Sequence, residues 1–199
     1  MNNDSAEALT GFTRVVVRPN IVLETLRSAS RPTDRLPVAL FAGRPLEWKG
    51  IRLLIRSRQL AKEQWTLELC GGSAEEFSEF GDVTAEGVRV RGRVARNELL
   101  QRLGEVSCVV LPSVHDSAGW IAAEAAAMGT PVVCLDIGGV EMMAGGFASV
   151  VEALPAETLT ARIAARIDLL TTGAHNVSGP SPDWTELSYR RELAKWYQL

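Results

Sequence analysis

Short apolar runs, most of them rich in β-branched residues, alternate along the chain with longer segments that have helical periodicity. The runs occupy residues 14–18, 38–42, 65–70, 88–91, 106–111 and 131–135, and the helix-like segments occupy 49–63, 73–80, 97–104 and 118–128. Strands that alternate with helices predict βαβ units, which have a parallel sheet and right-handed crossovers. The pattern therefore predicts an α/β fold with a doubly wound, Rossmann-like parallel sheet.

The last part of the chain has a different pattern. Leu159, Ile163 and Ile167 recur at four-residue spacing and predict an amphipathic helix over 155–170, followed by a loop rich in Gly, Ser and Pro over 171–182. A final helix is expected over 182–199, with aromatic side chains that pack back on the domain or on a missing partner; they are Trp184, Tyr189, Trp196 and Tyr197. The predicted boundaries are a disordered or leftover segment at 1–12, a Rossmann-like domain at 13–175, and a C-terminal loop and helix at 176–199 that packs back on the domain or on a missing N-terminal domain.

Composition narrows the class of protein. The chain has 199 residues, of which 46% are hydrophobic, and this length and composition predict a single domain with a full core. No apolar run approaches about 18 residues, and the polar, acidic start of the chain lacks a signal peptide's apolar region, so we expect a cytoplasmic protein without a transmembrane segment. The net charge of −3, with scattered basic residues, disfavours nucleic acid as a partner. Cys70, Cys108 and Cys134 lie in or at the ends of apolar runs and are expected to be reduced core residues.

The predicted helix 118–128 carries one polar side chain on an otherwise apolar surface. That residue is Glu124, and such a helix is usually buried between other elements. An unpaired carboxylate in that position costs several kcal/mol or takes up a proton. Glu124 therefore either points outward into water or lines a cleft where it meets hydrogen-bond donors. The cleft is favoured, because the preceding strand ends near Pro112 and ligands bind outside the carboxyl ends of parallel strands.

Other strand ends carry residues suited to a phosphate ligand. Arg44 and Lys49 follow the strand that ends at Ala42, beside the start of a helix, and two cations in this position suit a diphosphate. The alternative is a solvated turn in which Lys49 pairs with Glu47. Glycines at 71–72 and 138–139 permit close approach of a ligand to the backbone, although a plain strand-to-helix turn explains those at 71–72 equally well. There is no Walker loop and no Gly-x-Gly-x-x-Gly motif, which disfavours nucleoside triphosphate hydrolysis and classical dinucleotide binding.

These motifs, taken in order, resemble the carboxyl-terminal domain of the retaining GT-B glycosyltransferases of family 4. The resemblance covers roughly residues 14–198 and rests on the segments 41–50, 67–71, 88–92, 111–113, 116–124 and 129–133, with the glycine pair 138–139. It implies that Arg44 and Lys49 bind the donor diphosphate, that Asp116 contacts the donor sugar, and that Glu124 binds the nucleotide ribose. It also places at the donor site Gly43, Gly71, Gly92, His115, Ser117, Ala118 and Gly119.

Two positions depart from the family pattern. Asp116 stands where the family has Glu, which keeps the charge but shortens the reach by one methylene. The family's Gly-Phe-Gly between the two carboxylates is here Ser117-Ala118-Gly119, so only Gly119 carries over directly. For His115, a contact with the donor sugar and the role of an ordinary loop histidine both stay open.

The resemblance implies a hexosyltransferase type of activity that needs neither a metal nor a cofactor, with a nucleotide-diphosphate sugar as the substrate. No Asp-x-Asp pair or His/carboxylate cluster is present in the sequence, in agreement with this expectation. The chain corresponds to one half of a GT-B fold, so an N-terminal acceptor-binding domain or a separate chain is an expected partner. Peripheral membrane contact could come through that missing half, and the isolated chain is expected to transfer little or nothing.

Two other functions remain as alternatives. The chain could be a non-catalytic remnant of a donor site or an interaction subunit, which the substitution at Asp116 and the altered 117–119 loop would allow. It could also be half of a nucleotide-sugar epimerase, although the only clustered acid–base candidates are His115, Asp116 and Glu124.

Overall fold

The computed structural model describes residues 34–116, 119–173, 177 and 186–197. The predicted strand at 14–18 and the segment 1–12 lie outside the described residues. So do Ser117, Ala118 and Trp184.

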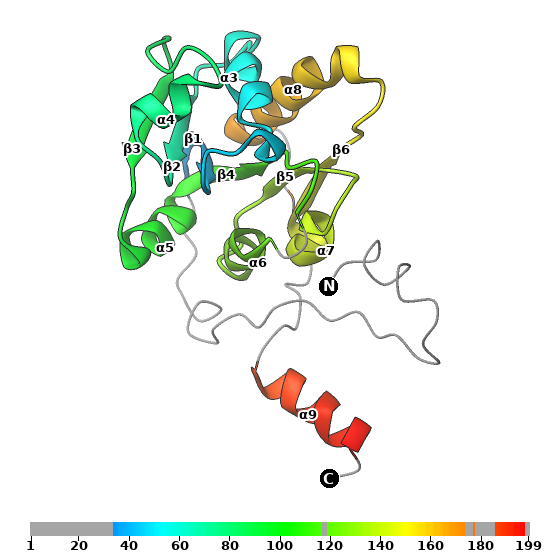
Figure 1. Ribbon diagram of the computed structural model, residues 1–199. Helices are drawn as coiled ribbons and strands as arrows, with labels where there is room; N and C mark the ends of the chain where they lie inside the picture. Colours follow the sequence, from blue (N-terminus) through cyan, green and yellow to red (C-terminus); the bar gives the residue numbers. More distant parts are fainter. Residues whose placement is uncertain (1–33, 117–118, 174–176, 178–185, 198–199) are drawn as a thin grey trace.

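Six parallel strands form one sheet, in the order β3-β2-β1-β4-β5-β6 (Figure 1). The strands are β1 (Leu36–Ala42), β2 (Thr66–Cys70), β3 (Val88–Gly92), β4 (Val106–Leu111), β5 (Val132–Leu135) and β6 (Ala148–Val151). Every residue of β4 and of β5 is buried, as expected for central strands that are covered on both faces. The predicted doubly wound, Rossmann-like class is confirmed.

Helices cover both faces of the sheet. In Figure 1, α3 and α8 lie together on one face, and α5, α6 and α7 lie on the other. Their bounds are α3 (Ile51–Gln59), α4 (Ala74–Ser78), α5 (Arg96–Glu105), α6 (Trp120–Ala127), α7 (Val140–Ala144) and α8 (Leu159–Thr171), with short 3-10 turns η1 (Glu47–Lys49), η2 (Gly145–Phe147) and η3 (Ala156–Thr158). The α8 side chains Ile163 and Ile167 are fully buried, as their spacing predicts. No helix among the described residues is long and apolar enough to cross a membrane.

The pattern analysis missed the last strand and the helix before it. β6 pairs with β5 in parallel, and α7 connects the two strands. β6 spans only Ala148–Val151, and glycines at 145 and 146 precede it. A four-residue run of this kind is too short to give a periodicity that separates a strand from a loop.

The strand order creates a crevice between the loops that follow β1 and β4. β1 lies between β2 and β4, and the chain winds outward from it in both directions. The loops that follow β1 and β4 therefore leave the sheet on opposite faces, and a crevice opens between them at the carboxyl ends of the two strands. Arg44 and Lys49 lie on the first loop and Asp116 lies on the second.

The C-terminal helix α9 (Glu186–Tyr197) stands apart from the helices that cover the sheet (Figure 1). Among its described side chains, Leu187 and Tyr189 are exposed. The side chains of Trp196 and Tyr197 lie outside the described part. The expected packing of these aromatic residues on the domain stays a prediction.

The three cysteines are buried and free, in agreement with reduced core residues. Burial raises the pKa of Cys70 to about 11 and the pKa values of Cys108 and Cys134 to about 12. A thiol in an unfolded chain titrates near pH 8.5. Above that pH the unfolded chain loses protons that the folded state keeps, so the thiols' contribution to stability is fully present below about pH 8.5 and is lost as the pH rises towards 11–12.

We therefore expect the free energy of unfolding to be flat near neutral pH and to fall above pH 9, by up to about 1.4 kcal/mol per pH unit for each thiol. Urea unfolding at pH 7.5, 9 and 10.5 measures this. Cys108→Ala is the control, because it removes one of the titrating groups and should make the slope shallower. Equal slopes for the two proteins would contradict the assignment to buried thiols.

Candidate donor-binding site

The loop after β1 is held close to the loop after β4 by backbone packing. Gly50 precedes α3 with a φ of 71°, and a Cβ on it would lie 2.3 Å from the carbonyl oxygen of Pro112. The Val114 amide donates to the carbonyl of Trp48 at 2.9 Å. The sequence analysis could not predict this contact, because it depends on how the two loops meet.

Lys49 and Asp116 form an ion pair across the crevice. The Lys49 Nζ lies 2.6 Å from Asp116 Oδ2, and their side chains are 23% and 15% exposed. Glu47 instead pairs with Arg52, at 3.7 Å. The solvated turn in which Lys49 pairs with Glu47 is therefore wrong, and Lys49 instead pairs with Asp116.

Asp116 also connects its own loop to two other segments. Its Oδ1 accepts a hydrogen bond from the Gly119 amide, at the start of α6, and its backbone carbonyl accepts one from the Gly139 amide at 2.8 Å. Three loops at the carboxyl edge of the sheet therefore meet at this one residue. His115 beside it is exposed, and both interpretations of its role remain open.

Glu124 is buried in α6, with 3% of its surface exposed. The interpretation as an outward, solvated glutamate is therefore wrong. Arg96, at the start of α5, forms a bidentate ion pair with it: Nη1 donates to Oε2 at 2.9 Å and Nη2 donates to Oε1. The hydrogen bond from Arg96 to Glu124 raises the pKa of the Arg96 guanidinium. Glu124 therefore meets a hydrogen-bond donor, as expected, and that donor is Arg96, which the sequence did not single out.

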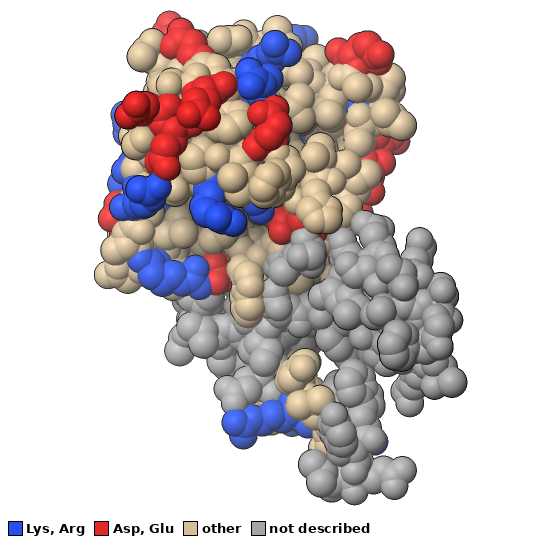
Figure 2. Space-filling model, in the orientation of Figure 1, with Lys and Arg blue, Asp and Glu red and all other residues tan. Residues whose placement is uncertain are grey.

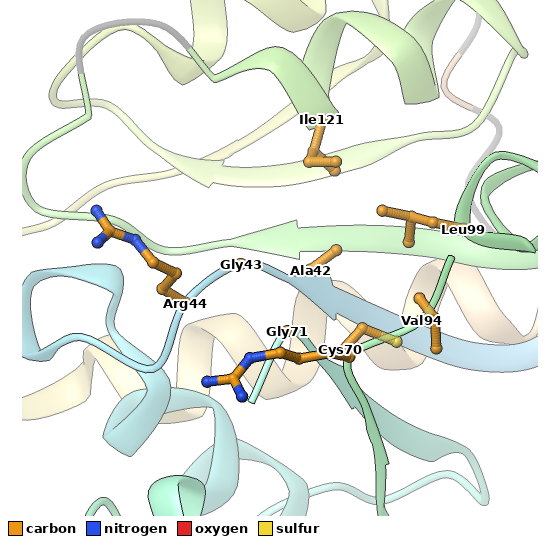
Figure 3. A pocket seen from close by; sticks show the side chains of 9 residues that line it. Ala42, Gly43, Arg44, Cys70, Gly71, Val94, Leu99 and Ile121 are labelled. Atoms are coloured by element: carbon orange, nitrogen blue, oxygen red, sulfur yellow. The ribbon is translucent and has the colours of Figure 1, made fainter. Parts of the chain in front are cut away.

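A pocket of about 330 Å³ opens at the carboxyl ends of β1 and β2 (Figure 3). It is lined by Ala42, Gly43, Arg44, Cys70, Gly71, Arg93, Val94, Leu99 and Ile121. Ile121 belongs to α6 and Leu99 belongs to α5, so the two helices that carry the Glu124–Arg96 pair also form the apolar wall of the pocket. The Cys70 sulfur and the Val94, Leu99 and Ile121 side chains face the same space in Figure 3.

The cations near the pocket differ in how far they are already neutralised. Arg93 pairs with Glu76 at 2.7 Å, and Lys49 and Arg96 hold the two site carboxylates. Arg44 is exposed, and no carboxylate within the described part of the chain forms an ion pair with it. In Figure 2, basic side chains gather below a band of acidic side chains that lies over α4.

Among the residues that the structure describes, no three His, Cys, Asp or Glu side chains are grouped so that they could hold a metal ion. Gly92 ends β3 with a φ of 78°, and its carbonyl accepts a hydrogen bond from the Gly71 amide at 2.8 Å. This bond links the two glycine turns on the β2–β3 side of the pocket.

The family model for the group 1 glycosyl transferases matches residues 36–171, which include all six strands and most of the helices. The chain belongs to the glycosyl transferases of group 1. This finding confirms the expected family at that level. The assignments to family 4 and to the C-terminal half of the GT-B fold stay predictions, because this match does not distinguish them.

The matches to curated relatives cover only part of each relative's length. The D-inositol 3-phosphate glycosyltransferase of Xylanimonas cellulosilytica is 33% identical over 127 residues, in a match that covers 58% of this chain and 30% of the relative. The alpha-maltose-1-phosphate synthase of Mycobacterium tuberculosis is 31% identical over 121 residues, in a match that covers 55% of this chain and 31% of the relative. The matched part therefore spans about a third of the length of these relatives.

Solved structures support the fold. AviGT4, a glycosyltransferase involved in avilamycin A biosynthesis, has a TM-score of 0.71 at 18% identity, over 99% of this chain and 61% of its own. The sucrose-phosphate synthase of Thermosynechococcus elongatus has a TM-score of 0.62 at 24% identity, over 84% of this chain and 46% of its own. At these identities the likeness concerns the fold alone.

Within this glycosyltransferase domain, the structure brings together most of the predicted site residues. Gly43, Arg44 and Gly71 line the pocket, and Lys49, Asp116 and Gly119 meet beside the crevice. Arg96 was missed. The signal that could have found it is its place just after a strand end, in the first turn of a helix that packs against α6.

Proposed function

We propose that this domain binds the nucleotide-sugar donor of a retaining glycosyltransferase. The observation that carries the proposal is the meeting of the Arg44–Lys49 loop with Asp116 at the switch point between β1 and β4, beside a pocket that α5 and α6 wall. Open α/β sheets bind ligands at such a point.

Each part of a nucleotide-sugar has a group that suits it. The apolar wall of the pocket, with Val94, Leu99 and Ile121, suits the flat faces of a base. Glu124 is a buried carboxylate that can accept hydrogen bonds from two vicinal ribose hydroxyls. Arg44 and Lys49 lie where the diphosphate would follow.

The same cations suit the chemical step. When the sugar is transferred, the departing nucleoside diphosphate gains negative charge. Arg44 offers a planar fork of donors, Lys49 offers a point charge, and the Gly119 amide lies at the start of α6, where the helix dipole favours an anion. Asp116 would contact the donor sugar, and its ion pair with Lys49 would hold the Asp116 carboxylate in position. We infer that no metal is needed, because these groups supply the compensating charge.

A second domain is part of the proposal. The match to the curated relatives covers about a third of the length of each. We infer that an acceptor-binding domain, in the same chain or a separate one, faces the carboxyl edge of the sheet. The exposed apolar side chains Trp48, Val114 and Trp120 flank the Lys49–Asp116 pair and suit such a contact.

Calorimetry with UDP-, GDP- and ADP-sugars tests the proposal. We expect one of the series to bind with a 1:1 stoichiometry, and the matching nucleoside diphosphate to retain most of the affinity, since base, ribose and diphosphate make most of the proposed contacts. Absence of binding by every member of the panel would contradict the donor site. Binding without transfer to any acceptor, even after the second domain is supplied, would instead favour a non-catalytic remnant, which the Asp116 substitution allows.

A further inference from the structure

Arg96 covers the carboxylate that the proposed function assigns to the ribose. The Glu124 side chain is 4% exposed and each of its oxygens accepts a hydrogen bond from the Arg96 guanidinium. The Arg96 side chain itself is 55% exposed. The buried acid is therefore shielded from the solvent side by a long side chain that lies mostly in water.

The pair adjoins the pocket on both helices. Ile121 lies three residues before Glu124 on α6, and Leu99 lies three residues after Arg96 on α5. Residues three apart share a helix face, so Glu124 continues the wall that Ile121 begins, and Arg96 continues the wall that Leu99 begins. A ribose that extends from a base in this pocket, past Ile121 and Leu99, would reach the Arg96–Glu124 pair next.

We propose that Arg96 is an internal competitor for Glu124, which holds the acid while the site is empty and swings out when a ribose arrives. The proposal rests on the proposed function, because it names what regulates that same site. The exposed guanidinium can move into water at little cost, whereas Glu124 is fixed in a packed helix. Two vicinal hydroxyls can then replace the two guanidinium donors one for one.

The exchange has a measurable consequence. A ribonucleotide must displace the Arg96–Glu124 ion pair before it can bind Glu124. The apparent affinity of the ribonucleotide is therefore its intrinsic affinity multiplied by the fraction of molecules in which the pair is open. Removing Arg96 should therefore tighten binding of a ribonucleotide. A ligand without ribose hydroxyls does not displace the pair and should gain nothing.

The test compares the full chain with Arg96→Ala, using the nucleoside diphosphate that the wild type binds and its 2′,3′-dideoxy form. We expect Arg96→Ala to tighten binding of the ribonucleotide by about three- to tenfold and to leave the dideoxy form within twofold. Arg52→Ala is the matched control, since it removes an exposed arginine that pairs with Glu47 away from the pocket, and it should change neither affinity.

The gain must also depend on Glu124. In a Glu124→Gln background, Arg96→Ala should give no tightening, because there is no ion pair to release. If Arg96→Ala does not fold, Arg96→Lys, which makes a weaker pair, should give a smaller gain of about twofold. Weaker or unchanged ribonucleotide binding in the folded Arg96 variant would overturn the competitor role, whereas a wild type that binds no nucleotide would overturn the proposed function instead.

Discussion

Replacing Arg44 by alanine is expected to lower the affinity of the domain for a nucleoside diphosphate by about ten- to hundredfold. A charge-assisted hydrogen bond contributes about 1.5–3 kcal/mol. Arg44 lines the pocket, and no ion pair with a carboxylate holds it in the described part of the chain, so its charge is available to the diphosphate. Lys49, by comparison, is already bonded to Asp116.

Calorimetry on wild type and Arg44→Ala measures this effect, with the parent nucleoside as a second ligand. The nucleoside lacks the diphosphate, so its affinity should change by less than threefold. Arg52→Ala controls for the loss of one positive charge, because Arg52 lies on α3 beside Glu47 rather than at the pocket. Equal losses for the nucleoside and its diphosphate would show that Arg44 does not bind phosphate.

Substituting alanine for Gly71 is expected to damage both the fold and the site. Gly71 has a φ of +113°, and a Cβ there would lie 2.3 Å from the Gly43 carbonyl oxygen. The obstacle is backbone, so the turn that carries Gly43 and Arg44 has to move. We expect a loss of about 2–4 kcal/mol in the free energy of unfolding, and at least a tenfold loss of nucleotide affinity.

Urea unfolding and calorimetry check the two parts separately. Gly173→Ala is the control, because its φ is also positive, at +71°, but a Cβ there meets no atom within 4 Å. That variant isolates the backbone cost, about 1–2 kcal/mol, and should leave nucleotide affinity unchanged. If both variants lose the same stability, the close contact between Gly71 and Gly43 does not limit the fold.

The alternation of apolar runs and helical segments was sufficient to predict the fold class, because the length and composition of a strand are visible locally. Five of the six strands in the sheet follow from such runs. β6 does not, since it has only four residues, and its assignment depends on pairing with β5. The helix of Glu124 was also predictable, because a single acid in an apolar segment stands out.

The partners of the site residues could not be predicted in the same way. Lys49 with Asp116 and Arg96 with Glu124 are 67 and 28 residues apart, so their contact depends on the strand order and on the packing of α5 against α6. The sequence analysis offered Glu47 as an alternative partner for Lys49 because local spacing was the only guide. The place of Arg96, after a strand end and at a helix start, was a weak signal, since one arginine in that position usually lies in water.

Mapping of backbone amide NMR shifts during titration with the best-binding nucleoside diphosphate shows at which end of the strands the nucleotide binds. A second cavity, of about 270 Å³, lies beside Trp65 and Gly87, where β2 and β3 begin rather than where they end. A donor site at the carboxyl ends of β1 and β2 predicts that the largest shifts occur at Gly43, Gly71 and Val94, while the Trp65 and Gly87 signals stay in place. Shifts concentrated at Trp65 and Gly87, with Gly43 and Gly71 unmoved, would contradict it.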